Sequence, residues 1–230
     1  MKAVIFAAGE GKRMRPLTFD TPKPLLKVLG KSLIQYTFEA MPDSVDEVVV
    51  VVGYKKEQIQ AFLGTEFLGR RVTYVVQEAV TGTADALMLA RPHLGEGAFL
   101  SFYADDIYAK ADVEKLLAHR YGVLVAEVSD PRAFGVVELA PDGRLVSFEE
   151  KPEHPKSNLV STGAFLLDEK MFSYSAPKNE KTGERYIVDM VMGLAHNEPF
   201  YGVLTNTWIP VGHPEDLKKA EQQLSGHERT

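Results

Sequence analysis

The chain has 230 residues, of which 45% are hydrophobic and 25% are charged, and it carries a formal net charge of −6. This composition is typical of a globular protein with one large domain, and the acidic balance argues against nucleic-acid and membrane-surface partners. The chain has no cysteine, which excludes disulfides, thiol catalysis and thiolate metal sites and fits a cytoplasmic location. No apolar run approaches the ~20 residues of a membrane span.

Strand and helix patterns alternate through the first half of the chain. We expect strands over Ala3–Ala8, Glu47–Val52, Arg71–Gln77 and Ala98–Ala104, and helices over Ser32–Met41, Lys56–Leu63 and Thr83–Ala90. The five consecutive valines of residues 48–52 suit a parallel strand that is covered on both faces, and Ser32 is placed to cap the first helix. This order predicts an α/β fold with a doubly wound, mostly parallel, Rossmann-like sheet.

After about residue 120, strands follow one another with few helices between them. The expected strands are Gly122–Val128, Gly135–Leu139, Leu145–Glu150, Val160–Leu167 and one near Phe200–Leu204, with helices over Gly183–His196 and Pro214–Leu224. The turn Pro141-Asp142-Gly143 predicts a hairpin. We therefore expect an inserted antiparallel part within a single domain of residues 1–224, whose halves are 1–120 and 121–224. A frayed tail is expected over 225–230.

Positive charge is concentrated in the first 31 residues, which carry a net +5 from seven Lys and Arg against Glu10 and Asp20. Most of these cations follow the first expected strand, in the sequence GEGKRMRPLTFDTPKPLLK of residues 9–27. An acidic protein with so much positive charge on one glycine loop is expected to bind a strongly negative ligand there.

Two common phosphate-binding loops do not fit this sequence. A dinucleotide fingerprint needs a third glycine and an acidic residue about 20 positions later, and both are missing after Gly9-Glu10-Gly11. A P-loop needs Ser or Thr after Gly11-Lys12, where Arg13 stands.

A backbone nest fits better, because small residues let amide groups approach a phosphate closely. Those residues are Ala7, Ala8, Gly9 and Gly11. Arg13 adds a planar fork of donors, and the prolines on either side of Lys23 indicate a second positioned cation.

Two stretches, FAAGEGKRMRPLT and TPKPLL, resemble the signature loop of the sugar nucleotidyltransferases, in the short form of the family without a C-terminal repeat domain. The resemblance implies a nucleotide-diphospho-sugar transferase fold. It also implies an enzyme that, with Mg²⁺, transfers a nucleotidyl group from an NTP to a sugar 1-phosphate and releases pyrophosphate. Further similar motifs are Gln77 with Gly82-Thr83-Ala84, Tyr103-Ala104-Asp105, Phe134-Gly135, Glu149-Glu150-Lys151-Pro152, Ser161-Thr162-Gly163, Gly183-Glu184-Arg185-Tyr186 and Trp208 with Gly212-His213-Pro214-Glu215-Asp216-Leu217.

The resemblance assigns the nucleotide to the glycine loop and to the end of the third strand. Arg13 would hold the β- and γ-phosphates, and Lys23 would hold the α-phosphate or the sugar phosphate; these two are the expected catalytic residues. The expected nucleotide-binding residues are Ala7, Ala8, Gly9, Gly11, Lys12, Gln77, Gly82 and Thr83. A side-chain amide can read the edge of a pyrimidine, which favours a uridine or thymidine nucleotide.

The same resemblance assigns the sugar and the metal to the strands that follow. The expected sugar-binding residues are Tyr103, Gly135, Glu150, Lys151, Thr162 and Gly163, with Glu184 and Tyr186 as further candidates. Strand register decides whether Glu149 or Glu150 faces the sugar. Asp105 is the expected Mg²⁺ ligand, because it ends a strand where open α/β sheets place their ligands. Asp106 would point elsewhere or cap a helix.

One position departs from the family pattern. The family often has an aspartate two residues after the tryptophan, as a second magnesium carboxylate, and Pro210 stands there after Trp208-Ile209. Mg²⁺ would then rely on Asp105 with water and phosphate, or on a neighbour such as Asp216, or bind weakly. His213 is expected to be a surface or capping residue.

These patterns leave several substrates open. The first expectation is UTP or dTTP, with glucose 1-phosphate as the default acceptor. The alternatives are GTP with mannose 1-phosphate or another sugar 1-phosphate, a phosphocholine-type cytidylyltransferase, and a nucleotide-binding paralogue with weakened catalysis, which only Pro210 suggests. The expected partners are the two substrates, with no nucleic acid and no membrane, and a homo-oligomer is left open.

Overall fold

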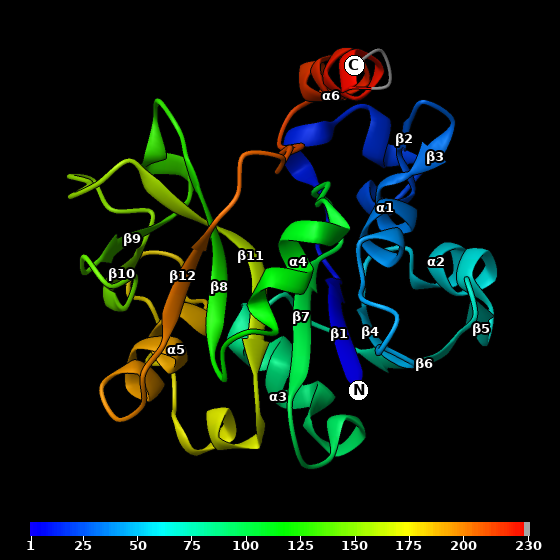
Figure 1. Ribbon diagram of the computed structural model, residues 1–230. Helices are drawn as coiled ribbons and strands as arrows, with labels where there is room; N and C mark the ends of the chain where they lie inside the picture. The colour runs from blue at the N-terminus through cyan, green and yellow to red at the C-terminus, as the bar shows by residue number, and fades with distance from the viewer. Residues whose placement is uncertain (228–230) are drawn as a thin grey trace.

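The computed structural model describes residues 1–227. Ten strands of this part of the chain form one mixed sheet (Figure 1). The parallel strands of the first half lie side by side in the order β7-β1-β4-β6, with bounds β1 Lys2–Ala7, β4 Glu47–Val52, β6 Arg70–Val76 and β7 Phe99–Tyr103. The short β5 (Glu66–Phe67) pairs antiparallel with β6 at the edge.

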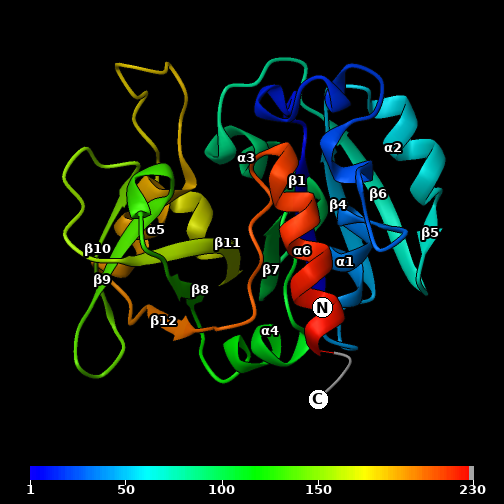
Figure 2. The ribbon, with the colours of Figure 1, turned by 90° about the horizontal axis from the view of Figure 1, so that it is seen from above.

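The valine run of β4 explains why helices cover both faces of the sheet. Successive side chains of a strand point to opposite faces, so Val49 and Val51 enter one core while Val48, Val50 and Val52 enter the other. The first core includes α3 and α5, and the second includes α1, α2 and α4, on the opposite face in Figure 2. The bounds are α1 Leu33–Glu39, α2 Lys56–Leu63, α3 Thr83–Leu94, α4 Lys110–Leu116 and α5 Ile187–Ala195.

The sheet continues into the second half of the chain through β11 (Leu159–Leu167). This long strand pairs antiparallel with β8 along most of its length, with β9 near its beginning and with β7 at its end. The remaining strands are β8 Gly122–Glu127, β9 Gly135–Leu139, β10 Leu145–Glu150 and β12 Tyr201–Leu204, which is parallel to β8. The two halves therefore share one sheet.

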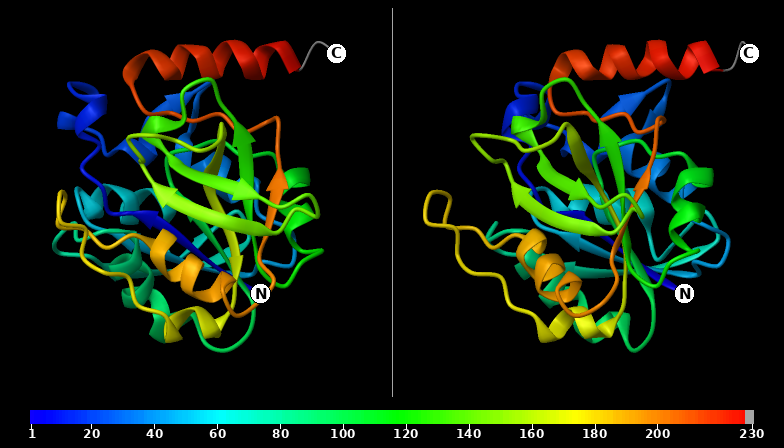
Figure 3. Two further views of the ribbon diagram at one scale, coloured as in Figure 1. Left: turned by 90° about the vertical axis from the view of Figure 1, so that its left-hand side faces the viewer. Right: turned by 60° about the vertical axis from the view of Figure 1, so that its left-hand side comes forward.

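The last helix, α6 (Pro214–His227), lies across the edge of the sheet where the parallel strands end (Figure 3). It packs there against the segment that follows β1, in a small apolar cluster that includes Met14, Leu26, Val28, Ile209 and Ala220. The same segment contains the hairpin of β2 (Lys27–Val28) and β3 (Lys31–Ser32) and the single turns Lys12–Met14, Leu17–Phe19 and Lys23–Leu25.

The structure confirms the predicted α/β sheet and most of its elements. The bounds of α2, β4, β9 and β10 are the predicted ones. The Ser32 hydroxyl accepts a hydrogen bond from the Gln35 amide at 3.3 Å, so Ser32 caps α1 as expected. None of the helices within residues 1–227 has the length and apolar character needed to span a membrane.

Three predicted boundaries were wrong. The helix expected from Gly183 begins only at Ile187, because Gly183 has a φ of 76° and the Arg185 backbone is bonded to another loop. The helix expected to end at Ala90 continues to Leu94. Residues 225–227 continue α6 rather than fraying, and the rest of the expected tail, 228–230, lies outside the described residues.

Helix α4 was not predicted, and it holds a buried carboxylate that fixes the chain after β12. Asp112 is 6% exposed. It accepts hydrogen bonds from the hydroxyls of Thr205, at 2.6 Å, and Thr207. Lys115 approaches the same carboxylate at 2.6 Å.

We expect Asp112→Ala to lower the free energy of unfolding by about 1–3 kcal/mol, because the Thr205 and Thr207 hydroxyls lose a buried acceptor. Urea denaturation measures the change. Asp43→Ala is the matched control, since Asp43 forms an exposed ion pair with Lys110 and exposed pairs contribute little. Equal losses in both variants would contradict this role for Asp112.

Candidate active site

The predicted site residues gather at the edge of the sheet where β1 and β7 end. These strands are adjacent and parallel, so the glycine loop after Ala7 and the carboxylate of Asp105 after β7 lie at the same edge. Open α/β sheets bind their ligands at this edge. Gln77 follows β6 and lies at the same edge of the sheet, two strands away from β1.

The glycine loop adopts a shape that only glycine takes without strain. Gly11 has a φ of 61°, and a Cβ there would lie 3.0 Å from atoms of both Lys23 and Thr18. The Thr18 hydroxyl donates to the Gly11 carbonyl at 2.9 Å, and the Tyr54 hydroxyl donates to the Thr18 carbonyl at 2.8 Å. A Cβ at Gly9 would meet nothing within 4 Å, so the backbone there faces open space.

The cations of this loop differ in whether they have partners. Lys12 and Arg15 both pair with Glu10, at 3.2 and 3.5 Å, and the Arg15 guanidinium lies 5.2 Å from the centre of the Phe19 ring. Arg13 has no ion pair with any side chain of residues 1–227. Its guanidinium lies beside the backbone of Gly212. Arg13 is therefore a cation with its donors available to a ligand.

Lys23 is buried and holds the expected metal ligand. The side chain of Lys23 is 10% exposed, that of Asp105 is 33% exposed, and their Nζ and Oδ2 atoms are 2.5 Å apart. In this structure the charges of Lys23 and Asp105 neutralise each other beside the glycine loop.

Asp105 is the residue that fits a magnesium ion. No cluster of three or more His, Cys, Asp or Glu side chains that could hold a metal occurs within the described part of the chain. Mg²⁺ commonly uses one or two carboxylates and completes its coordination with water and phosphate oxygens. One carboxylate with a lysine at 2.5 Å fits a divalent ion that arrives together with phosphates.

The adjacent Asp106 turns away from this site, as predicted, but it does not cap a helix. Its carboxylate accepts from the Trp208 indole N–H at 3.0 Å and from the Val211 amide at 3.2 Å. Burial, followed by the nearby charge of Asp105, raises the pKa of Asp106 to about 7. Asp106 thus ties the segment that contains Pro210 to the end of β7.

The loop after β6 is held by a segment from the other half of the chain. The Arg185 amide donates to the Thr81 carbonyl at 2.8 Å, and the Arg185 carbonyl accepts from the Ala84 amide at 3.1 Å. Gly82 has a φ of 114°, and a Cβ there would lie 2.1 Å from the Arg185 carbonyl oxygen. Only glycine allows this approach.

Gln77 also supports this loop. It is 5% exposed, and its side-chain amide donates to the Gly82 carbonyl at 3.2 Å. Thr83 accepts from the Ile187 amide at 3.0 Å. In this structure both predicted nucleotide-binding side chains make bonds inside the protein.

The predicted acceptor residues come together around the ring of Tyr103. A Cβ at Gly163, whose φ is 83°, would lie 2.3 Å from that ring, so the ring packs directly on the Gly163 backbone. Burial, followed by the charge of Glu150, raises the pKa of the Tyr103 phenol. Glu149 is exposed, whereas Glu150 shares the inward side of β10 with Phe148 and lies beside Gly135. Register therefore turns Glu150, and not Glu149, inwards.

Lys151 follows in a strained conformation. Its φ is 46°, and its ammonium lies 2.7 Å from the Glu150 carboxylate and 5.6 Å from the centre of the Tyr186 ring. Non-glycine residues in the left-handed region are uncommon and cluster at functional sites. Lys151 is thus held beside Glu150, another of the expected sugar-binding residues.

Two of the expected residues have structural partners instead of open surface. Thr162 is 1% exposed, and its carbonyl accepts from the Tyr108 hydroxyl at 3.0 Å. Asp216 accepts from the Gly212 and His213 amides at 3.0 and 2.8 Å, so it caps α6 from within the first turn. His213 stands directly before this helix.

Sequence reasoning missed the contacts of Asp106 and of Arg185. Asp106 is the immediate neighbour of Asp105 after β7, and its partners lie 102 and 105 residues away. Arg185 makes these contacts through its backbone atoms, so the type of its side chain does not indicate them. The glycine at position 82 was the one sequence signal for this contact.

Comparisons with known proteins agree with the fold. The sequence profile of the nucleotidyl transferase family matches residues 2–226. The chain is 35% identical over 226 residues to the bifunctional protein GlmU of Methanocaldococcus jannaschii, which covers 97% of this chain and 54% of that protein. The chain thus spans about half the length of the first curated relatives it matches.

Two further comparisons cover nearly all of both chains. The UTP–glucose-1-phosphate uridylyltransferase AglF of Haloferax volcanii is 34% identical over 237 residues, which cover 97% of this chain and 96% of AglF. A crystal structure of a Bacillus anthracis protein, assigned as a glucose-1-phosphate thymidylyltransferase, superposes with a TM-score of 0.86. It is 28% identical, and the match covers 97% of this chain and 94% of that one.

The raised pKa of Asp106 has a consequence for stability. Between pH 3.8, the ordinary pKa of an aspartate, and about pH 7, Asp106 keeps a proton in the folded protein that it has lost in the unfolded chain. The stability contributed by this proton is complete at low pH and is lost as the pH rises towards 7. We expect urea unfolding curves of the wild type and of Asp106→Asn to show it, because the amide does not titrate. The wild type should lose stability relative to the variant between pH 4 and pH 7, and a constant difference would contradict the shift.

Proposed function

Because this chain belongs to the nucleotidyl transferase family, we propose that it is an enzyme that transfers a nucleotidyl group from an NTP to a sugar 1-phosphate. UTP or dTTP is the proposed donor and glucose 1-phosphate the first acceptor to test. Two relatives support this choice, since one is named a UTP–glucose-1-phosphate uridylyltransferase and another a glucose-1-phosphate thymidylyltransferase.

The observation that carries the proposal is the arrangement of charge at the edge of the sheet. Arg13 has available donors, and the buried Lys23, which packs against Gly11 in the same loop, pairs with the partly exposed Asp105. A triphosphate brings several negative charges, which such cations and backbone amides stabilise. A flexible surface turn would not bury a lysine or fix it with a carboxylate.

In the proposed reaction, an oxygen of the sugar 1-phosphate attacks the α-phosphorus of the NTP. The bond from the α-phosphorus to the bridging oxygen breaks, and pyrophosphate leaves with that electron pair. The attacking phosphate oxygen is already ionised, so no base has to remove a proton. The main barriers are repulsion between two anions and their orientation, and fixed charges lower both.

Each cation has a distinct part in this proposal. Arg13 would bind the β- and γ-phosphates and neutralise the departing pyrophosphate. Lys23 would move its contact from Asp105 to the α-phosphate or the sugar phosphate. On the acceptor side, Glu150 would accept from sugar hydroxyls, and Lys151 would meet the 1-phosphate.

Asp105 would hold Mg²⁺, which when bound supplies positive charge to the phosphate oxygens. Pro210 offers no second carboxylate, and Asp216 already has two amide donors and the Lys219 ammonium. Asp105 would therefore be the one protein carboxylate at this metal. Arg13 and Lys23 then carry a larger share of the charge stabilisation than they would beside two carboxylates.

The proposal is tested by pyrophosphate release, measured for four NTPs against several sugar 1-phosphates, with each substrate omitted in turn as the control. We expect turnover with UTP or dTTP and glucose 1-phosphate. Binding of an NTP without turnover for any pair would instead favour a nucleotide-binding paralogue. Turnover with CTP and phosphocholine alone would identify the cytidylyltransferase alternative.

We expect Arg13→Met to lower kcat/KM by about 10²–10³, the range for losing one donor to transition-state charge. Arg15→Met is the matched control, because Arg15 lies in the same loop but is paired with Glu10 and packed on Phe19. Steady-state kinetics of both variants measure the difference. Similar losses in the two would show that the loop contributes only general positive charge.

The Lys23–Asp105 pair gives a test that does not need turnover. Lys23 competes with a divalent ion for the same carboxylate. Without nucleotide, Mn²⁺ binding measured by electron paramagnetic resonance should strengthen in Lys23→Met and disappear in Asp105→Asn, while turnover falls in both. Unchanged Mn²⁺ binding in Asp105→Asn would mean that another residue holds the metal.

A further inference from the structure

A cavity opens at the edge of the sheet opposite the candidate active site, where the parallel strands begin. Its volume is about 480 Å³. It lies next to Ala98, directly before β7, whereas Asp105 is the second residue after β7. A strand rises about 3.3 Å per residue, so the cavity and the candidate active site are on the order of 20 Å apart. None of the residues that line the cavity has a role in the proposed reaction.

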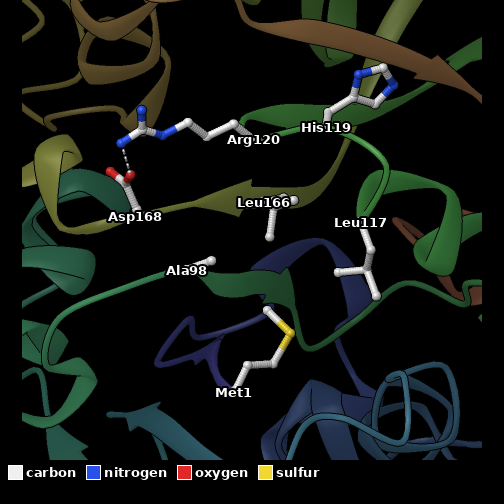
Figure 4. A pocket seen from close by; sticks show the side chains of 7 residues that line it. All are labelled: Met1, Ala98, Leu117, His119, Arg120, Leu166 and Asp168. Carbon is white, nitrogen blue, oxygen red and sulfur yellow. Dashed lines mark hydrogen bonds and ion pairs between the residues drawn. The ribbon is translucent and has the colours of Figure 1, made fainter.

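The cavity is lined by apolar side chains, which we call the floor, and by polar side chains, which we call the rim. The floor consists of Met1, Ala98, Leu117 and Leu166, of which Leu166 is buried while Ala98 and Leu117 are exposed, and the rim consists of His119, Arg120 and Asp168 (Figure 4). Binding sites for small molecules are typically cavities of about 300–1,000 Å³ with mostly apolar walls and a few placed polar groups. This cavity has a volume in that range, and both apolar and polar side chains line it.

The rim is built around a buried carboxylate. Asp168 is 6% exposed, and its oxygens accept from the Tyr121 hydroxyl at 2.7 Å, the Lys170 amide at 2.9 Å and the Arg120 guanidinium at 3.2 Å. Three donors therefore satisfy the Asp168 carboxylate. The nearby Glu198 is paired with Lys170 at 2.5 Å. Neither carboxylate is left as an unpaired negative charge that would repel an anion.

Arg120 is fixed at the rim but keeps donors for a ligand. Its guanidinium lies 5.1 Å from the centre of the Tyr121 ring and bonds Asp168 through Nη2. The side chain is 59% exposed, and a guanidinium has five N–H groups in a planar fork. On the other side of the floor, the His119 ring stacks on Tyr201 with centroids 4.4 Å apart. Both rim groups are thus held in place before a ligand arrives.

We propose that this cavity is a second binding site, for a small molecule with a planar apolar body and one anionic group. The apolar body contacts Leu117, Leu166 and Ala98, and the anion bonds the Arg120 guanidinium. A carboxylate and a phosphate both match the planar fork of donors, so the shared chemistry is an oxyanion on an apolar ring. This site does not depend on the proposed transferase activity.

The test uses phenyl phosphate and phenylacetate as separate probes, with phenol as the neutral probe, and saturation-transfer NMR as the readout. We expect the full chain to bind one or both anions at millimolar concentration and phenol more weakly. Arg120→Met should weaken anion binding by about tenfold or more, since a charged hydrogen-bond partner is lost. Leu117→Glu, at an exposed position, should do the same by placing a carboxylate in the wall. The stronger of the two anionic probes distinguishes a phosphate site from a carboxylate site.

Two controls separate this cavity from other cations of the chain. Arg132→Met removes an arginine that is exposed and paired with Asp130 elsewhere, and binding should be unchanged. Arg13→Met should also leave binding unchanged, whereas loss of binding in that variant would place the probe in the candidate active site. Absent binding of both anions, or binding that resists Arg120→Met and Leu117→Glu, would overturn the proposal. Arg120→Met should leave pyrophosphate release unchanged.

Discussion

The ion pair between Lys23 and Asp105 is the contact on which the candidate site depends. It connects the glycine loop to the end of β7 with a nitrogen–oxygen distance of 2.5 Å, and the lysine is almost completely buried. Burying a charge is unfavourable unless another charge compensates it. The fold can therefore keep a cation beside the loop without a ligand only because Asp105 follows the neighbouring strand. Gly11 packs against the same lysine, so the shape of the loop depends on this pair as well.

The second feature of the site is that both halves of the chain build it together. The ring of Tyr103, at the end of β7, packs on the backbone of Gly163 in β11. The loop that ends with Gly82 is bonded to Arg185, on the segment that leads into α5. Two glycines remove the side chains that would keep these segments apart. The segments proposed to bind the nucleotide and the acceptor are consequently in direct contact.

Much of the fold follows from local pattern, whereas the fine structure of the site does not. The valine run of β4 is read from neighbouring residues, because burial on both faces leaves an uninterrupted apolar run. Helix α4 was missed because it has only seven residues and no capping side chain, whereas α1, of the same length, is preceded by the cap residue Ser32. The start of α5 was misplaced because long-range bonds hold Arg185 extended. The partners of Asp106 are set by topology, which no local pattern records.

The position of Asp106 has an evolutionary consequence for Pro210. Asp106 binds the residues on either side of Pro210, through Trp208 and Val211, and the nearby charge of Asp105 already raises the pKa of Asp106, so a carboxylate at position 210 would add a further negative charge to this segment. Positions 106 and 210 are therefore expected to vary together among related sequences. An acidic residue at 210 calls for an uncharged acceptor at 106, and the proline here permits the aspartate. Replacing Pro210 alone with an acidic residue would then be a poor way to create a second metal ligand. Exchanging positions 106 and 210 together would avoid the additional negative charge.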